Sequence, residues 1–155
     1  MENYLDQYDL DHAAKANVVL HILSIPLLYI GLMGLLWLLP DDLIKSWMGD
    51  LPFANWATVF AILMLVYYGS ESFSMTFPTG GFLLGCLFLV NRISLFMPEY
   101  FQIIMAVTFI SGIMLMLTGH LIEGNTRAMG NDFKYFMITP AWIFRFVFQK
   151  FDIPL

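Results

Sequence analysis

The chain has 155 residues, of which 59% are apolar and only 12% are charged, about half the charged fraction of an ordinary soluble domain. A soluble domain of this size buries only about 70% of the surface that its unfolded chain exposes, so this composition excludes an ordinary soluble protein and predicts a membrane protein. The net charge of −5 argues against nucleic acid as a partner. The single cysteine, Cys86, excludes a disulfide within the chain and a cysteine-based metal site.

Four apolar runs approach the length of roughly 20 residues that crosses about 30 Å of hydrocarbon. They cover residues 17–39, 53–76, 80–97 and 100–119. We therefore predict an all-α membrane protein in which four transmembrane helices form one bundle, a single integral membrane domain over residues 1–155. The acidic start of the chain has neither the basic region nor the cleavage site of a signal peptide, so we expect the first span to be retained.

Prolines and glycines interrupt these runs. Pro26 predicts a kink in the first span because its ring nitrogen cannot donate a helix hydrogen bond. Pro78, with Gly80 and Gly81, predicts a tight turn into the third span. Gly81 and Gly85 form a GxxxG pair, for which we expect close packing within the chain rather than dimerisation.

The C-terminal segment, residues 133–151, interleaves aromatic and basic side chains, and Pro140 is expected to break it midway. This pattern predicts a helix in the membrane interface that bears Trp142 and Phe146. Basic residues gather near both ends of the chain, whereas Lys45 is alone between the first two spans. The positive-inside rule therefore predicts a multi-pass protein of the bacterial inner membrane or endoplasmic reticulum with both termini in the cytoplasm.

Candidate site residues lie at the span ends that this topology brings to one membrane face. His12 and His21 flank the start of the first span, and His120 ends the fourth. His120 and Glu123 are three residues apart and share a helix face. Three histidines with one carboxylate predict a site for Fe(II), Zn(II) or Mn(II). The alternative is that these histidines bind lipid headgroups or backbone groups.

Polar residues near the histidines are expected to support this site. His12 and His21 lie on opposite faces of a straight helix, so both reach one site only if the chain breaks between them, with Asn17 as the helix cap. Glu71, near the end of the second span, either faces this site or is an interfacial carboxylate. Asn125 follows the last span and is a further supporting candidate.

The two histidine-bearing regions resemble a known family, once labelled domain of unknown function 962, to which the yeast-type 2-hydroxy fatty acid dioxygenase belongs. The resemblance extends from Tyr8 to about Phe148. It rests on two motifs, His12-x4-Asn17-x3-His21-x4-Pro26 in the first span and Gly119-His120-x2-Glu123 after the fourth.

This resemblance implies an Fe(II)-dependent membrane enzyme that uses O2 to shorten a long-chain 2-hydroxy fatty acid by one carbon, with Zn or Mn as substitutes in a purified sample. Carried over by position, it implies that the three histidines, His12, His21 and His120, are iron ligands or lie close to the iron. Glu123 is then a ligand or the partner of a ligand. Lys15 or Arg127 is expected to pair with the substrate carboxylate, or to act only as a positive-inside residue.

Two other functions are consistent with these residues. A haem protein would use His21 and His120 as axial ligands and would show a Soret band. A non-enzymatic membrane protein or transporter would use Glu71 and the histidines as a proton relay. The sequence contains no duplicated half with broken helices, which counts against a transporter.

Overall fold

The computed structural model describes residues 5, 6, 8, 14–124 and 136–150. Within these ranges every regular element is a helix and no strand occurs, which confirms the all-α prediction. The helices are α2 (Lys15–Trp37), α3 (Asp42–Met48), α4 (Trp56–Glu71), α5 (Phe73–Phe96), α6 (Phe101–Glu123) and α8 (Thr139–Lys150).

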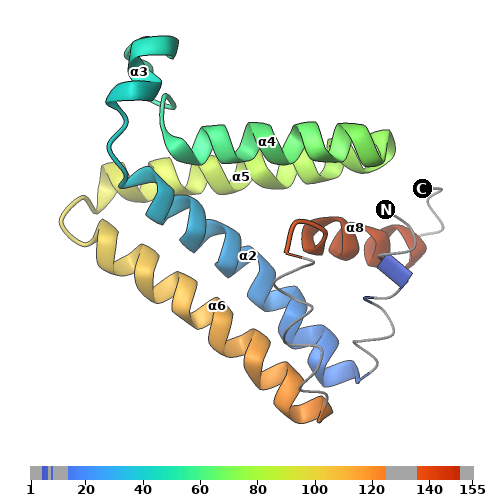
Figure 1. Cartoon of the computed structure of the whole chain (residues 1–155). Helices are drawn as coiled ribbons and strands as arrows, with labels where there is room; N and C mark the ends of the chain where they lie inside the picture. Colours follow the sequence, from blue (N-terminus) through green and yellow to red (C-terminus); the bar gives the residue numbers. More distant parts are fainter. Residues whose placement is uncertain (1–4, 7, 9–13, 125–135, 151–155) are drawn as a thin grey trace.

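The long helices form two antiparallel pairs, α2 with α6 and α4 with α5 (Figure 1). The pairs meet at the side of the molecule that carries α3 and the α5–α6 connection, and they diverge toward the other side. Helix α8 lies between the two diverging arms, where it contacts α5 and α2. The start of α2 and the end of α6 are therefore together at the tip of one arm.

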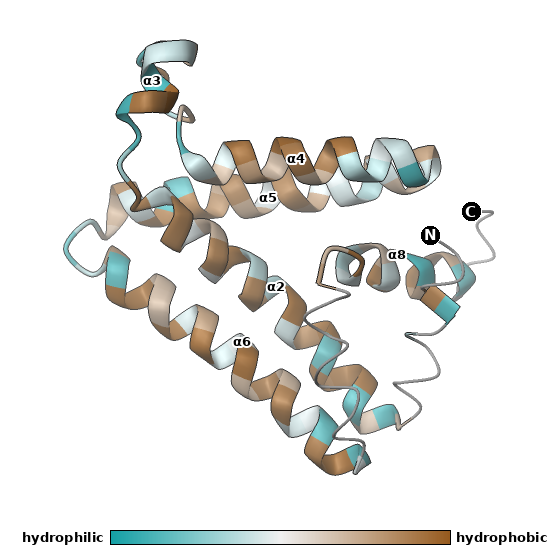
Figure 2. Ribbon diagram, viewed as in Figure 1, coloured by the Kyte–Doolittle hydropathy of each residue, from teal (hydrophilic) through white to brown (hydrophobic). Residues whose placement is uncertain are grey.

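Three helices, α2, α5 and α6, are long and apolar enough to cross a membrane. Figure 2 shows hydrophobic residues along their middle parts and hydrophilic residues concentrated toward several helix ends. Helix α4 is also apolar but has only 16 residues, about 24 Å at 1.5 Å per residue. It is therefore shorter than a hydrocarbon core of about 30 Å, and the expected second crossing lacks the full length of the other three.

Glycines allow α2 and α6 to pack closely. A Cβ atom at Gly31 would lie 2.5 Å from the backbone nitrogen of Phe109, and one at Gly112 would lie 2.9 Å from that of Leu28. No side chain fits at either place, so the two backbones approach more closely than larger residues would allow. This contact aligns the two helices along the arm that carries the histidines.

The GxxxG pair on α5 does not have this role. A Cβ at Gly81 or Gly85 would meet nothing within 4 Å. The expectation that this pair packs within the chain is therefore wrong, because these glycines lie on a face of α5 that no described residue covers.

The boundary between α4 and α5 differs from the prediction. The chain breaks at Ser72, which is extended, and α5 continues through Pro78 without the expected turn. The hydroxyl of Thr76 donates to the Ser72 carbonyl at 3.0 Å and that of Thr79 to the Met75 carbonyl at 2.5 Å. Side-chain donors of this kind let an apolar helix tolerate a proline.

Helix α8 also departs from the expected pattern. Pro140 is its second residue and does not break it, because the first N–H groups of a helix have no partner within the helix and a proline there loses nothing. Trp142 is buried, whereas Phe146 is exposed. One face of α8 is therefore packed inside the protein, between the two arms.

Candidate functional site

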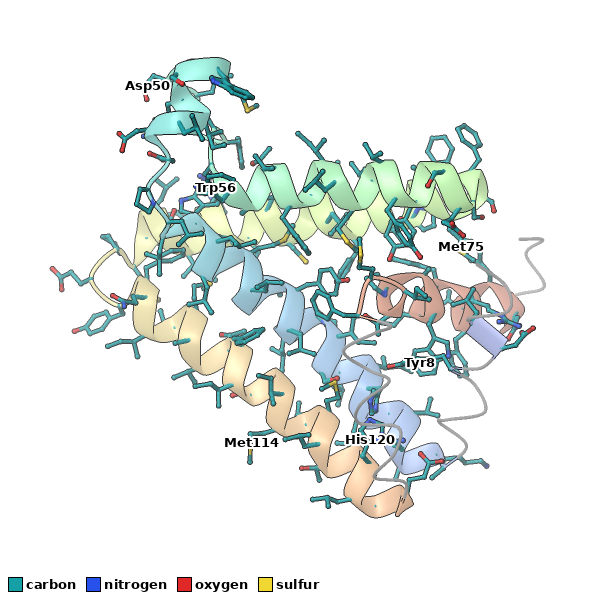
Figure 3. The ribbon with its side chains drawn as sticks, in the orientation of Figure 1. Tyr8, Asp50, Trp56, Met75, Met114 and His120 are labelled. Atoms are coloured by element: carbon teal, nitrogen blue, oxygen red, sulfur yellow. The ribbon has the colours of Figure 1, made fainter. Side chains whose placement is uncertain are left out.

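Two histidines from opposite ends of the sequence are neighbours in the structure. His21 lies on α2 and His120 in the last turn of α6, and both side chains are fully buried. Their ring centroids are 4.8 Å apart and the ring planes cross at 77°. Figure 3 shows the position of His120 near the end of α6. The antiparallel contact of α2 and α6 thus joins imidazoles that are 99 positions apart in the sequence.

Glu123 binds the start of α2 through both carboxylate oxygens. Its Oε1 accepts the Ala14 N–H at 3.0 Å, and its Oε2 accepts a hydrogen bond from the Asn17 side-chain amide. An anion at this position also suits the positive end of the α2 dipole. We call this set the Glu123 clamp, comprising Glu123, Ala14 and Asn17. It ties the last turn of α6 to the first turn of α2.

The expected cap at Asn17 is therefore a wrong prediction. Helix α2 begins at Lys15, after the extended residue Ala14, so Asn17 lies inside the first turn. The carboxylate of Glu123, from another helix, accepts the hydrogen bond from the backbone N–H of Ala14, the residue just before the helix. The amide of Asn17 contributes to the contact between helices and not to a local cap.

Asn17 also orients His21. The Nδ1 atom of His21 lies 3.0 Å from the backbone carbonyl oxygen of Asn17. A carbonyl oxygen only accepts, so Nδ1 carries the hydrogen and Nε2 carries the lone pair in the neutral ring. The hydroxyl of Ser24 donates to the His21 carbonyl at 3.0 Å and completes a buried polar turn. This tautomer suits an Nε2 metal ligand.

Gly119 is required where α6 passes this turn. A Cβ at Gly119 would collide with the Asn17 side-chain oxygen and lie 3.1 Å from Nδ1 of His21. The residue before His120 must therefore lack a side chain for α6 to reach α2 at this depth. The Gly119-His120 pair of the sequence motif has a direct steric explanation.

The sequence did not predict the two aromatic residues, Tyr8 and Trp142, that lie near the histidines. Tyr8, from the N-terminal segment, is buried, and its ring centroid is 6.4 Å from that of His21. Tyr8 also contacts Trp142 of α8, with ring centroids 5.1 Å apart. The available signal was the presence of tyrosines and leucines within an acidic segment. The sequence predicts Trp142 in the membrane interface, whereas the structure buries it against Tyr8.

The other candidate residues are not part of this cluster as the structure describes it. Glu71 is exposed at the end of α4, on the other arm. Lys15 is exposed at the first residue of α2. Three candidates, His12, Asn125 and Arg127, lie outside the described residues.

The described residues of this site supply only part of a set of metal ligands. In the parts of the chain that are described, no three His, Cys, Asp or Glu side chains are grouped to hold an ion. The buried pair of His21 and His120 offers two imidazoles, which suit iron, zinc or copper, while Glu123 is engaged by α2. The two ring centroids are only 4.8 Å apart, so no porphyrin fits between the rings in this arrangement.

Comparison with known proteins agrees with these features. The family model described as 2-hydroxy-palmitic acid dioxygenase Mpo1-like matches residues 1–151, nearly the whole chain. No curated protein and no solved structure gives a significant match. The matched region includes both histidine-bearing helix ends and α8. The chain therefore belongs to the Mpo1-like family of 2-hydroxy-palmitic acid dioxygenases.

Proposed function

We propose that this protein is an Fe(II)-dependent membrane dioxygenase that converts a long-chain 2-hydroxy fatty acid into the acid one carbon shorter. The observation that carries the proposal is the buried contact of His21 with His120 in a chain of the Mpo1-like family. Two fully buried imidazoles in ring contact supply two of the nitrogen ligands that an iron site uses.

His21 and His120 would hold the iron, with a further ligand from residues outside the described part of the chain, for which His12 is the candidate. The iron supplies O2 activation and Lewis acidity when bound. The reaction balances as 2-hydroxy acid plus O2 giving the shorter acid, CO2 and water. Carbon 1 leaves as CO2 and carbon 2 becomes the new carboxyl carbon.

The Glu123 clamp would keep the side chains of His21 and His120 in a fixed position relative to each other. It fixes the first turn of α2 on α6, and the Asn17 carbonyl within that turn sets the His21 ring. In this role Glu123 is not itself an iron ligand. It acts by holding His21 in place, as carboxylates that support metal-binding histidines do in other proteins.

The substrate's acyl chain would lie in the bilayer beside this arm. Apolar side chains are exposed on α2 and α6 close to the histidines: Val19, Leu23, Leu121 and Ile122. Each buried methylene of a fatty acid is stabilised by about 0.8 kcal/mol, so a long chain partitions into lipid. Its polar head would then reach the histidine pair at the helix ends.

We place both termini in the cytoplasm, with α4 as a fourth crossing at a locally thinned bilayer. Support comes from the Figure 1 arrangement, in which the start of α2 and the ends of α4 and α6 lie away from α3. A crossing by a 16-residue helix requires thinning or flanking polar side chains that reach water. Reporter fusions at residues 50 and 155 should report opposite sides, and the same side for both would contradict this topology.

Turnover tests the function directly. Full-length protein in detergent, supplied with Fe(II) and O2, should convert 2-hydroxypalmitic acid into the acid with one carbon fewer, measured by mass spectrometry. His120→Ala should remove product and lower bound iron while the helical circular dichroism is retained. Glu99→Gln, an exposed change in the α5–α6 connection, is the matched control and should keep full turnover.

Two results would contradict the proposal. One is turnover that persists in excess chelator, and the other is full activity of His120→Ala. Either result would leave the family membership as a matter of fold only.

A further inference from the structure

Helix α5 carries a single charged residue, near the end that leads into α6. This residue, Arg92, lies four positions before Phe96, the last residue of α5, so its Cα atom is about 6 Å from the helix end at 1.5 Å per residue. Helix α5 has 24 residues, about 36 Å, and is long and apolar enough to cross a hydrocarbon core of about 30 Å. When α5 is centred in the bilayer, Arg92 therefore lies at the edge of the hydrocarbon, close to the lipid headgroups.

The side chain of Arg92 lies on a helix face that is otherwise apolar and open. Arg92 is exposed, and so are the residues at i, i+4 spacing from it: Leu84, Phe88 and Phe96 are 62%, 61% and 70% exposed. The guanidinium carbon lies 5.8 Å from the ring centroid of Phe88 and 4.7 Å from that of Phe96. These cation–π contacts hold the guanidinium between neighbouring helix turns. They do not neutralise its positive charge.

No carboxylate in the described part of the chain forms an ion pair with Arg92. Lys45 in α3 is the other described cation on this side of the molecule (Figure 1), and the carboxylates of Asp41 and Asp50 lie 3.1 and 3.9 Å from its ammonium. Arg92 differs from Lys45 because its charge has no counterion among the described residues. The guanidinium therefore faces the membrane with an unbalanced positive charge.

The face of α5 that carries Arg92 stays open toward the middle of the helix. Gly81 and Gly85 lie on it at helical spacing from Arg92, and a Cβ at either glycine would meet nothing within 4 Å. Leu84 and Phe88 flank this open surface. Because the two glycines have no side chains, an acyl chain can lie directly against the helix and gain van der Waals contact.

We propose that Arg92 binds the phosphate of a membrane phospholipid whose acyl chain lies along Leu84 and Phe88. A charge at the hydrocarbon edge is costly unless it is paired, and arginines near helix ends extend toward the headgroups. The planar guanidinium can donate two parallel hydrogen bonds to one phosphate. This lipid is not the substrate, because the histidine pair lies on the other side of the molecule (Figures 1 and 3).

A second copy of this chain fits the same face less well. Two copies with the same membrane topology are related by an axis along the membrane normal, so their α5 helices run parallel. The two Arg92 side chains would then approach each other across the interface, where like charges repel. A phosphate group supplies the opposite charge instead.

Native mass spectrometry of the full-length protein tests this site. Delipidated protein in a neutral detergent is titrated with palmitoyl-oleoyl phosphatidylglycerol and, separately, with the diacylglycerol that carries the same two chains but no phosphate. We expect the unmodified protein to bind the phospholipid with a dissociation constant about tenfold lower than that of the diacylglycerol, as for one charge-assisted hydrogen bond. Arg92→Gln should bring this ratio close to one. Its unfolding temperature without added lipid should stay unchanged, because the described partners of Arg92 are two exposed rings.

Lys45→Gln is the matched control. It removes one positive charge from the same side of the molecule, but from a lysine that already has two carboxylate partners, so the ratio should stay at about tenfold. Arg92→Lys keeps the charge and loses the planar fork, and it should retain part of the preference for the phospholipid.

Several results would overturn this proposal. One is a full preference for the phospholipid in Arg92→Gln, and another is equal binding of the two lipids by the unmodified protein. An equal loss of preference in Lys45→Gln and Arg92→Gln would show diffuse attraction between charges and no bound phosphate. Dimers of the unmodified protein that bind no phospholipid would show that a second copy covers this face of α5.

Discussion

The two ends of the α2–α6 pair differ in how deeply their polar groups are buried. At one end, which we call the site end, Asn17, His21 and His120 are fully buried and Glu123 binds across helices. At the other end, which we call the loop end, polar contacts are short-range and mostly close to water, with the buried Asn55 cap of α4 as an exception. Examples close to water are the bond from Trp56 Nε1 to the Pro40 carbonyl at 2.8 Å and the salt bridges of α3.

This contrast shows where function constrains the fold. Buried polar groups must be bound, and a change in one partner leaves the other unsatisfied at a cost of about 1–3 kcal/mol. Exposed groups exchange their partners for water at little cost. Changes at the site end should therefore alter activity and stability together, whereas changes at the loop end should affect stability alone, or nothing.

The largest effect is expected from Gly119→Ala at the site end. The added methyl collides with the Asn17 side chain and crowds Nδ1 of His21, so the Glu123 clamp must open. We expect a loss of about 1–3 kcal/mol in stability, as for other overpacked contacts. Activity should fall on the order of 100-fold, as for displacements of about 1 Å at reacting groups. Turnover and thermal unfolding in detergent measure both effects.

Gly85→Ala is the control for that change. It adds the same methyl to a helix but meets nothing within 4 Å. It should keep full activity and stabilise the helix by up to about 1 kcal/mol, the difference in helix propensity between the two residues. Equal activity in Gly119→Ala and Gly85→Ala would show that the clamp does not set the histidine geometry.

A smaller effect is expected from Glu123→Gln. The amide keeps the shape of the side chain but loses its charge and one of the two acceptor oxygens that bind Ala14 and Asn17. Activity should fall by about 10 to 100-fold with iron content retained, which is the usual cost of losing a group that orients a metal ligand. Iron content that falls in parallel with activity would instead identify Glu123 as a direct ligand.

At the loop end, Asn55→Ala should change stability only. The Asn55 side-chain oxygen caps α4 by accepting the Thr58 N–H at 3.2 Å. Loss of such a cap costs about 1 kcal/mol, visible as a lower unfolding temperature with unchanged turnover. Asn55→Asp keeps an acceptor and should restore most of the stability. A fall in activity that exceeds the loss of folded protein would show that the two ends are coupled.

The smallest effect is expected from Asp41→Asn. The Asp41 carboxylate, 3.1 Å from the Lys45 ammonium, raises the pKa of Lys45 above its ordinary value of 10.5, with a lesser contribution from Asp50. A raised lysine pKa stabilises the fold below the pKa of the unfolded chain, and this contribution is lost as pH rises through the higher folded value.

Asp41→Asn should therefore return the pKa of Lys45 toward 10.5 and lower stability at neutral pH only slightly, because solvent screens this exposed pair. Nuclear magnetic resonance titration of labelled lysine measures the pKa. Asp42→Asn is the matched control, since Asp42 contributes least to the shift. A larger change in the control than in Asp41→Asn would contradict this assignment.

Composition and hydropathy are enough to predict the helical class and the apolar helices that form the two arms. Run length and hydropathy report burial in an apolar medium directly, so α2, α5 and α6 were foreseen as helices long enough to cross a membrane. Helix boundaries were less well predicted. The sequence predicts breaks at Pro78 and Pro140. Pro140 is the second residue of α8 and removes no hydrogen bond, whereas hydroxyls near Pro78 bind carbonyls of the surrounding turns.

Which polar residues meet depends on packing between helices and could not be predicted from the sequence. Periodicity within one helix says nothing about its partner, so sequence spacing did not reveal the role of Asn17, whose side chain binds Glu123 of another helix. Tyr8 was missed for the same reason, because its burial depends on α8. The approach of His21 to His120 depends on Gly31, Gly112 and Gly119, whose missing side chains allow contact between two helices that are remote in sequence.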